Sequence, residues 1–177
     1  MALPARARRA AALGTAAILA LGLLGGCTPA GGPGSTSRTE HSPSDAADAI
    51  ADLPGISSAE VSTSTEGTAN QVLLQARVAA DAGYAADPAD LLDYVVRQVW
   101  STTGRRPTTA VRVDLTVEGQ DLDLEALAGA IGLPGTVDTR NRYDASVHLR
   151  VEDLVEAYGR WPGDVPSPPP SLTDAVS

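Results

Sequence analysis

The chain of 177 residues contains one cysteine, Cys27, at the end of an apolar N-terminal segment. A single thiol cannot form an internal disulfide, so the fold that follows it must be stabilised by side-chain packing alone. The chain also lacks lysine and phenylalanine. Its core must therefore consist of valine, leucine, isoleucine and alanine, with a few tyrosines and tryptophans as the large side chains.

Residues 1–26 have the three-part layout of an export signal. Three arginines come first, an apolar run extends from Ala10 to Leu24, and small residues follow. The run is shorter than the ~20 residues that a membrane-spanning helix needs. We therefore expect a signal peptide over residues 1–26. An ordinary secretory signal in which the cysteine occurs by chance, or an uncleaved anchor, would have the same layout, and these are the alternatives.

The tetrapeptide Leu24-Gly25-Gly26-Cys27 resembles the lipobox of bacterial lipoproteins, with a leucine three positions before the cysteine and small residues between. The resemblance implies cleavage before Cys27, whose thiol then carries a diacylglycerol. Each buried methylene contributes ~0.8 kcal/mol, and two acyl chains anchor a protein where one does not. We expect a lipid-anchored protein at the cell membrane, facing outside the cytoplasm, with no cofactor besides this covalent lipid.

The charge of the exported part is strongly negative. Removing residues 1–26 removes three of the 13 arginines and none of the 22 acidic residues, which leaves 10 against 22 and a net charge of −12. Such a chain is repelled by phosphate groups. We therefore expect no nucleic-acid partner and no binding to anionic lipid through the domain itself.

Composition divides the exported chain into three parts. Residues 27–44 are rich in Gly, Pro, Ser and Thr, which predicts a disordered tether that also contains His41. Residues 161–177 are rich in proline, which cannot continue a helix or join an inner strand, so we expect an extended, disordered tail. A polyproline-binding partner for this tail is the alternative. Residues 45–160 between them have the length of one domain.

Hydrophobic periodicity predicts the elements of residues 45–118. We expect a short helix capped by Ser44 and stopped by Pro54-Gly55, and then a hairpin of strands 56–64 and 72–78. A longer helix begins with Asp87 as its cap and closes at Gly104. Strand 109–118 alternates apolar residues with charged and polar ones, which predicts one buried and one solvated face.

The order of elements then repeats. Leu133-Pro134-Gly135 follows a second short helix, 80 residues after Leu53-Pro54-Gly55 follows the first. Two strands, 136–142 and 145–151, and a helix come next. We predict a duplication with repeats 45–103 and 122–160, joined by strand 109–118. The alternative is chance similarity in an alanine-rich chain.

The order helix, Leu-Pro-Gly, strand, strand, helix, strand resembles the ferredoxin-like sandwich. It is similar to the heavy-metal-associated domain around Leu53-Pro54-Gly55-Ile56, and to the BON domain of bacterial envelope proteins in its element order. The first family binds metal through a Cys-x-x-Cys loop, and this chain has one cysteine, so no metal site carries over. The second resemblance implies attachment to envelope surfaces or partners. The predicted fold class is α+β, an antiparallel sheet with helices packed on one face.

Motifs with a known chemistry are absent from the sequence: it contains no nucleophile elbow, phosphate loop, dinucleotide fingerprint or zinc-spaced His/Cys set. We therefore expect no catalytic residues. The polar side of the predicted sheet is the candidate binding face, with Arg77, Arg112, Asp114, His148 and Arg150 as its candidate residues. If the three arginines converge, the face is an anion or carboxylate site. The alternative is a solvated surface of cross-strand neighbours.

The sequence thus favours a non-catalytic binding or assembly module at the cell envelope, with an envelope protein as the possible partner. A carrier of a small apolar ligand or lipid is one alternative. An envelope enzyme or enzyme accessory with a site near His148 is another. The sequence does not indicate the oligomeric state.

Overall fold

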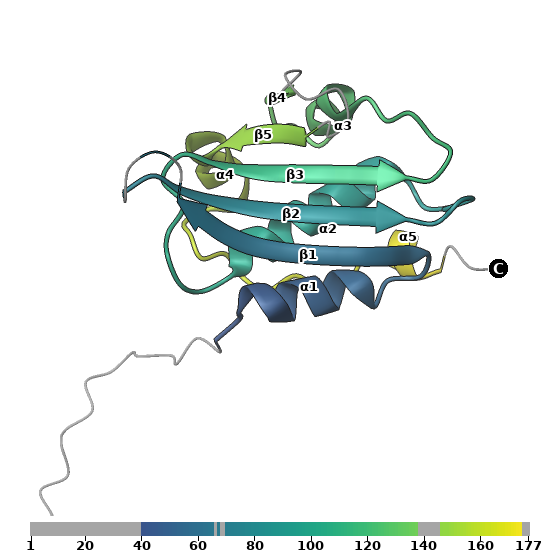
Figure 1. The fold of residues 1–177 in the computed structure, drawn as a ribbon, viewed down its shortest axis with the longest axis horizontal. Helices are drawn as coiled ribbons and strands as arrows, with labels where there is room; N and C mark the ends of the chain where they lie inside the picture. The colour runs from purple at the N-terminus through teal and green to yellow at the C-terminus, as the bar shows by residue number, and fades with distance from the viewer. Residues whose placement is uncertain (1–39, 66, 68–69, 138–145, 175–177) are drawn as a thin grey trace, which may run out of the picture. The chain divides into compact units, whose positions relative to one another are not determined.

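Alternating apolar and polar residues form a five-stranded sheet in the order β1-β2-β3-β5-β4 (Figure 1). The computed structural model describes residues 40–65, 67, 70–137 and 146–174. The predicted signal peptide, Cys27 and the predicted tether up to residue 39 lie outside these described residues. The bounds of the strands are β1 (Ile56–Thr65), β2 (Val72–Ala80), β3 (Ala110–Val117), β4 (Gly135–Val137) and β5 (Ser146–Arg150).

The sheet is mixed, so the predicted antiparallel sheet is wrong at one pairing. β1 and β2 form the predicted antiparallel hairpin, and β5 is antiparallel to both β3 and β4. β2 and β3, however, are parallel. The reason is α2 (Pro88–Ser101), which carries the chain back along the sheet so that β3 begins at the same end as β2.

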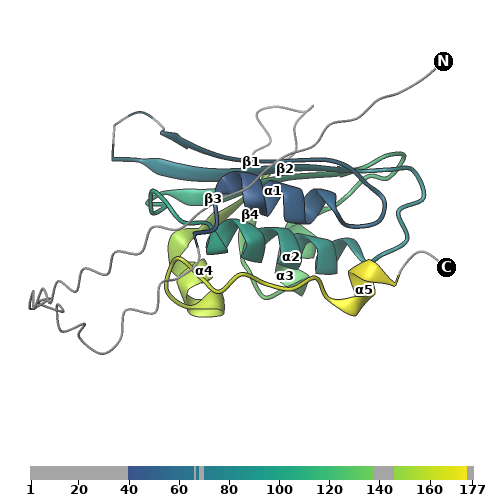
Figure 2. The same ribbon diagram turned by 90° about the horizontal axis from the view of Figure 1, so that it is seen from below.

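The helices lie on one face of the sheet, as the α+β prediction requires (Figure 2). They are α2, α1 (Pro43–Ala51), α3 (Leu124–Ala130) and α4 (Val151–Tyr158). α1 lies along β1, one of the two outer strands of the sheet (Figure 1). The hydrophobic core lies between the two layers and includes the inward side chains of three neighbouring strands: Leu74, Ala76, Val78, Val111, Val113, Leu115, Val147 and Leu149.

Capping residues fix where the helices begin. Asp87 caps α2 as predicted, and its side chain accepts a hydrogen bond from the amide of Ala89 at 2.8 Å. α1 is capped two residues earlier than predicted, by Ser42 instead of Ser44. The amide of Asp45 donates to Oγ of Ser42 at 3.1 Å, and the amide of Ser42 donates to Oδ2 of Asp45 at 2.7 Å. This reciprocal pair satisfies two amides that the helix leaves unpaired.

The ordered domain also begins earlier than predicted, because His41 is not in a tether. Its side chain is buried, and its Nε2 lies 3.0 Å from Oε1 of Gln98 in α2. Its main chain is bound as well: the amide of Thr103 donates to the carbonyl of His41 at 2.7 Å. These contacts join residues about sixty positions apart, so composition around His41 could not reveal them.

The prediction of a disordered tail is wrong for residues 161–174, which we call the C-terminal strap. The strap runs along α2 and ends in α5 (Pro170–Thr173), where Leu172 is 1% exposed (Figure 2). The amide of Gly163 donates to the carbonyl of Trp100, and Nε2 of Gln98 donates to the carbonyl of Pro166. Prolines exclude helix and inner strand, but an extended chain still has free carbonyls to accept hydrogen bonds and can bury one leucine.

The two halves of the chain have the same order of elements, helix-strand-strand-helix, on either side of β3. In the sheet, β2 and β5 flank β3, and β1 and β4 are the outer strands. The two Leu-Pro-Gly segments differ in detail. Gly55 has a positive φ of 77°, whereas Gly135 is packed against Val147 and Ala128. The duplication stays a prediction.

Candidate binding face

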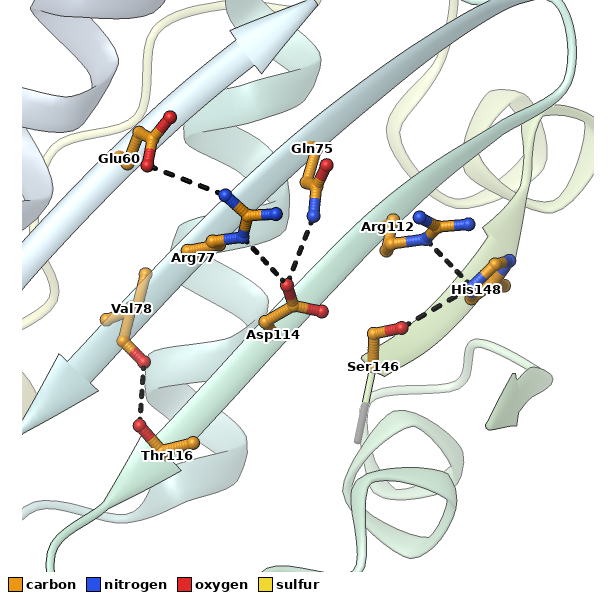
Figure 3. Close-up of polar contacts among 9 residues, drawn as sticks. All are labelled: Glu60, Gln75, Arg77, Val78, Arg112, Asp114, Thr116, Ser146 and His148. Atoms are coloured by element: carbon orange, nitrogen blue, oxygen red, sulfur yellow. Dashed lines mark hydrogen bonds and ion pairs between the residues drawn. The ribbon is translucent and has the colours of Figure 1, made fainter. Parts of the chain in front are cut away.

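The side of the sheet away from the helices carries polar side chains, because inward and outward residues alternate along each strand (Figure 3). Strand register aligns these side chains in two rows. We call the two rows together the polar sheet face. The first row is Glu60, Arg77, Asp114 and Ser146, and the second is Ser62, Gln75, Arg112, His148 and Thr136.

Asp114 is the centre of the first contact network. Its Oδ2 accepts hydrogen bonds from Nε of Arg77 at 3.3 Å and from Nε2 of Gln75 at 3.1 Å. Nη1 of Arg77 also lies 3.8 Å from Oε2 of Glu60. Three strands therefore contribute to one network, and the carboxylate fixes the orientation of the side chains beside it.

The other carboxylate oxygen of Asp114 is buried and has no hydrogen-bond partner among the described residues. The side chain as a whole is 17% exposed, so this oxygen lies just beneath the surface of the face. An unsatisfied buried acceptor costs roughly 1–3 kcal/mol. A donor from outside would remove that cost only after the side chains over Oδ1 move.

His148 is the centre of the second network. Nε of Arg112 donates to Nε2 of His148 at 2.9 Å. A guanidinium can only donate, so Nε2 accepts and the imidazole is neutral, with its proton on Nδ1. Oγ of Ser146 lies 3.4 Å from the same nitrogen. Ser146 was missing from the predicted face, although the alternation of its strand points to it.

Arg150, the fifth candidate, does not join these networks. Its Nε and Nη2 donate to the two carboxylate oxygens of Asp153, both at 2.8 Å, and its Nη1 lies 3.3 Å from Glu152 in the first turn of α4. These hydrogen bonds raise the pKa of the Arg150 guanidinium. The three arginines therefore do not converge, and the predicted anion site of Arg77, Arg112 and Arg150 is not formed.

The polar sheet face is electrically balanced. Arg77 and Arg112 carry two positive charges and Glu60 and Asp114 carry two negative charges, whereas the whole chain has a net charge of −9. The face is therefore a neutral surface of strong hydrogen-bonding groups on an acidic protein. It can form paired hydrogen bonds with a polar surface without a large electrostatic preference.

Residues 40–65, 67, 70–137 and 146–174 contain no group of three or more His, Cys, Asp or Glu side chains placed to hold an ion. None of the helices described is long and apolar enough to cross a membrane.

Comparisons with models of protein families, with curated proteins and with solved structures gave no match.

Proposed function

We propose that the protein is a lipid-anchored lipoprotein outside the cytoplasm that acts as a non-catalytic binding or assembly module at the cell envelope. Two features support the proposal. The segment Leu24-Gly25-Gly26-Cys27 supplies the anchor, and the polar sheet face supplies the contact surface. The polar sheet face is the observation on which the binding role depends.

A sheet face that only meets water needs no fixed arrangement of its side chains. Here Asp114 holds Arg77 and Gln75, and Arg112 holds His148. Side chains that are ordered before a partner arrives lose less conformational entropy on binding. Oδ1 of Asp114, which has no partner among the described residues, adds an acceptor that a partner's donor can satisfy once the side chains over it move.

The contacts of His148 favour a binding role over a catalytic one. A general base for Ser146 needs a free nitrogen lone pair, and the Nε2 lone pair of His148 already accepts from Arg112. The distance of 3.4 Å from Oγ of Ser146 is also long for a nucleophile and its base.

The partner that suits this face is a protein surface of mixed polar and charged groups. A balanced face selects no charge sign at close range, but the acidic chain repels strongly acidic partners at longer range. The tether would enter the domain at His41, which contacts α2 in the helix layer and not the sheet face.

The anchor is tested by replacing the lipidated residue. Cys27→Ser should move the protein from the membrane fraction to the soluble fraction of cells, because the thiol is the attachment point of the lipid. Leu3→Ala, a change in the same signal segment but outside the tetrapeptide, is the control and should leave the protein in the membrane. An unchanged membrane fraction for Cys27→Ser would contradict the anchor.

The face is tested by photo-crosslinking in intact cells. A photo-reactive residue at Ser62 should give one defined adduct, whereas the same residue at the exposed Glu156 of α4 should not. Asp114→Asn keeps the shape but removes the charge that holds Arg77, and it should reduce the Ser62 adduct. Equal adducts from Ser62 and Glu156, or an adduct indifferent to Asp114→Asn, would count against the face.

A further inference from the structure

The C-terminal strap contacts the rest of the domain with one edge. Burial along it repeats every third residue: Gly163, Pro166 and Pro169 are partly buried, the four residues between them are exposed, and Leu172, the next in the series, is buried. Residues 163–169 form neither helix nor strand, and Pro169 has a φ of −71° and a ψ of 152°. These angles and a period of three residues are those of a polyproline II helix. The strap therefore lies along α2 as an extended helix of this kind up to α5 (Figure 2).

The surface of α2 under the strap carries groups that suit a polyproline helix. Such a helix has no internal hydrogen bonds, so its carbonyls are free to accept. Nε2 of Gln98 donates to the carbonyl of Pro166 at 3.2 Å. The ring of Trp100 lies against Gly163, where a Cβ would be 3.0 Å from its Cδ1, and Tyr94 lies beside Pro166. Polyproline segments typically dock on aromatic surfaces. We call Tyr94, Gln98 and Trp100 the strap site.

The strap site is held in shape by residues outside the strap. Nε2 of Gln98 also donates to the hydroxyl of Tyr94 at 2.8 Å, and Oε1 of Gln98 lies 3.0 Å from Nε2 of His41. The indole N–H of Trp100 donates to the carbonyl of Gly159 at 3.2 Å. The donor and the ring therefore keep their orientation when the strap leaves, which lowers the entropic cost of binding another segment.

The contacts of the strap define a spacing more than a sequence. Gly163 has to be small because of Trp100, Pro166 is bound through its carbonyl, and Leu172 is 1% exposed. The pattern is Gly-x-x-Pro-x-x-Pro-x-x-Leu over residues 163–172. A segment of another protein with the same spacing can make the same contacts.

The strap does not fill all the space beside α2. Two cavities of about 230 and 220 Å³ lie between them, and both are lined by Arg97 of α2 and by Pro166. Val165 borders the first cavity and Ser167 borders the second. A segment with larger polar side chains at these two positions would gain contacts that the strap lacks.

Charge distinguishes the possible occupants of the strap site. The strap contains Asp164 and Asp174 and no basic residue, and the whole chain has a net charge of −9. A second copy would bring the same charge again, whereas a basic segment is attracted to the acidic chain. We propose that the strap site binds a basic, proline-rich segment of another protein, and that the strap occupies the site until such a segment displaces it. This inference depends neither on Cys27 nor on the polar sheet face.

The test uses a fluorescent synthetic peptide of residues 161–174 and the full-length protein with Leu172→Ala, in which the protein's own strap is weakened. Fluorescence anisotropy should show saturable binding with a dissociation constant below about 1 mM. The unsubstituted protein should bind the peptide at least about tenfold more weakly, because its own strap competes at a high effective concentration. No saturation, or equal affinity for the two proteins, would overturn the inference. If Leu172→Ala does not fold, Gly163→Val in the full-length chain weakens the strap instead.

Peptide variants test the spacing and the charge. Gly163→Val in the peptide should weaken binding about tenfold, and Val165→Ala, at an exposed position, should leave it unchanged. Asp174→Arg in the peptide should strengthen binding about threefold, and about 0.5 M NaCl should remove this gain. Equal binding of the Gly163→Val peptide, or weaker binding of the Asp174→Arg peptide, would overturn the inference. A dimer of the unsubstituted protein in sedimentation would assign the strap site to a second copy and would also overturn it.

Discussion

The C-terminal strap gives the sharpest quantitative prediction, because Leu172 is its deeply buried apolar side chain. Leu172 is 1% exposed, and Leu172→Ala removes three carbon atoms from that environment. At ~0.8 kcal/mol per methylene the lost transfer free energy is about 2.4 kcal/mol, and the remaining cavity adds to it. We therefore expect a decrease of about 2–4 kcal/mol in the free energy of unfolding.

The strap follows α4 and adds no strand to the sheet, so it can also detach while the rest of the domain stays folded. In that case the loss cannot exceed the free energy with which the strap docks on α2. Urea unfolding followed by circular dichroism measures the total loss, and hydrogen exchange of residues 161–174 measures the local part. Leu172→Ala should lower both the free energy of unfolding and the protection of residues 161–174 against hydrogen exchange.

The matched control is Val165→Ala in the same strap. Val165 is 52% exposed, so its truncation should change the free energy of unfolding by less than about 0.5 kcal/mol. If Leu172→Ala also stays within about 0.5 kcal/mol of the unsubstituted protein, the strap does not contribute to the fold and the account of residues 161–174 is wrong.

Three further changes test the core and its polar contacts. Gly135→Ala should cost about 1–3 kcal/mol in urea unfolding, because a Cβ there would overlap Cγ2 of Val147 and lie 3.1 Å from Cβ of Ala128; a neutral change would show that β4 shifts freely. Gln98→Ala should cost at least about 2 kcal/mol by the same assay, since it leaves His41, Tyr94 and the carbonyl of Pro166 without their shared partner; a loss no larger than that of Gln75→Ala would contradict this. Burial, and then the charge of Asp90, raises the pKa of Tyr84 from 10 to about 12. Because the unfolded chain loses the phenol proton more easily, the contribution of Tyr84 to the free energy of unfolding is complete below pH 10 and is lost as the pH rises from 10 towards 12. Tyr84→Phe should therefore remove part of the loss of stability over that range, and an identical pH profile for both proteins would refute this assignment.

Much of the fold follows from local pattern. The alternation of Val111, Val113 and Leu115 with polar residues predicts β3, and Asp87 before Pro88 predicts the start of α2. Such signals depend on neighbours within one or two turns of chain. The parallel pairing of β2 with β3 depends on where α2 places the chain, which no local pattern contains.

The ends of the domain could not be predicted for a related reason. His41 and Leu172 lie in polar or proline-rich surroundings, and each is buried by contacts with residues far away in the sequence. Composition is an average over all residues of a segment, so one buried side chain does not change the prediction that the segment is disordered. A segment without its own core can still dock on a core that another segment provides.

Most residues of the candidate site could be predicted from the sequence, but the contacts among them could not. Alternation placed Arg77, Arg112, Asp114 and His148 on one face of the sheet, where the register brings them into adjacent rows. Arg150 alternates in the same way, but it is the last residue of β5 and binds Asp153 in the helix that follows. Which arginine meets which acid depends on strand register and on helix ends, and the sequence contains neither directly.

The most direct test of the proposed binding role measures how accessible the polar sheet face is in cells. Lipidation would occupy Cys27, so a cysteine introduced elsewhere would be the single free thiol. Thr116→Cys places it on the polar side of the sheet, beside Asp114, and Glu156→Cys places it on α4; both positions are exposed. Maleimide labelling should be several-fold slower at residue 116 in intact envelopes than in purified protein, and equally fast in both at residue 156. Equal labelling rates at residue 116 in envelopes and in purified protein would contradict the proposal that this face binds a partner.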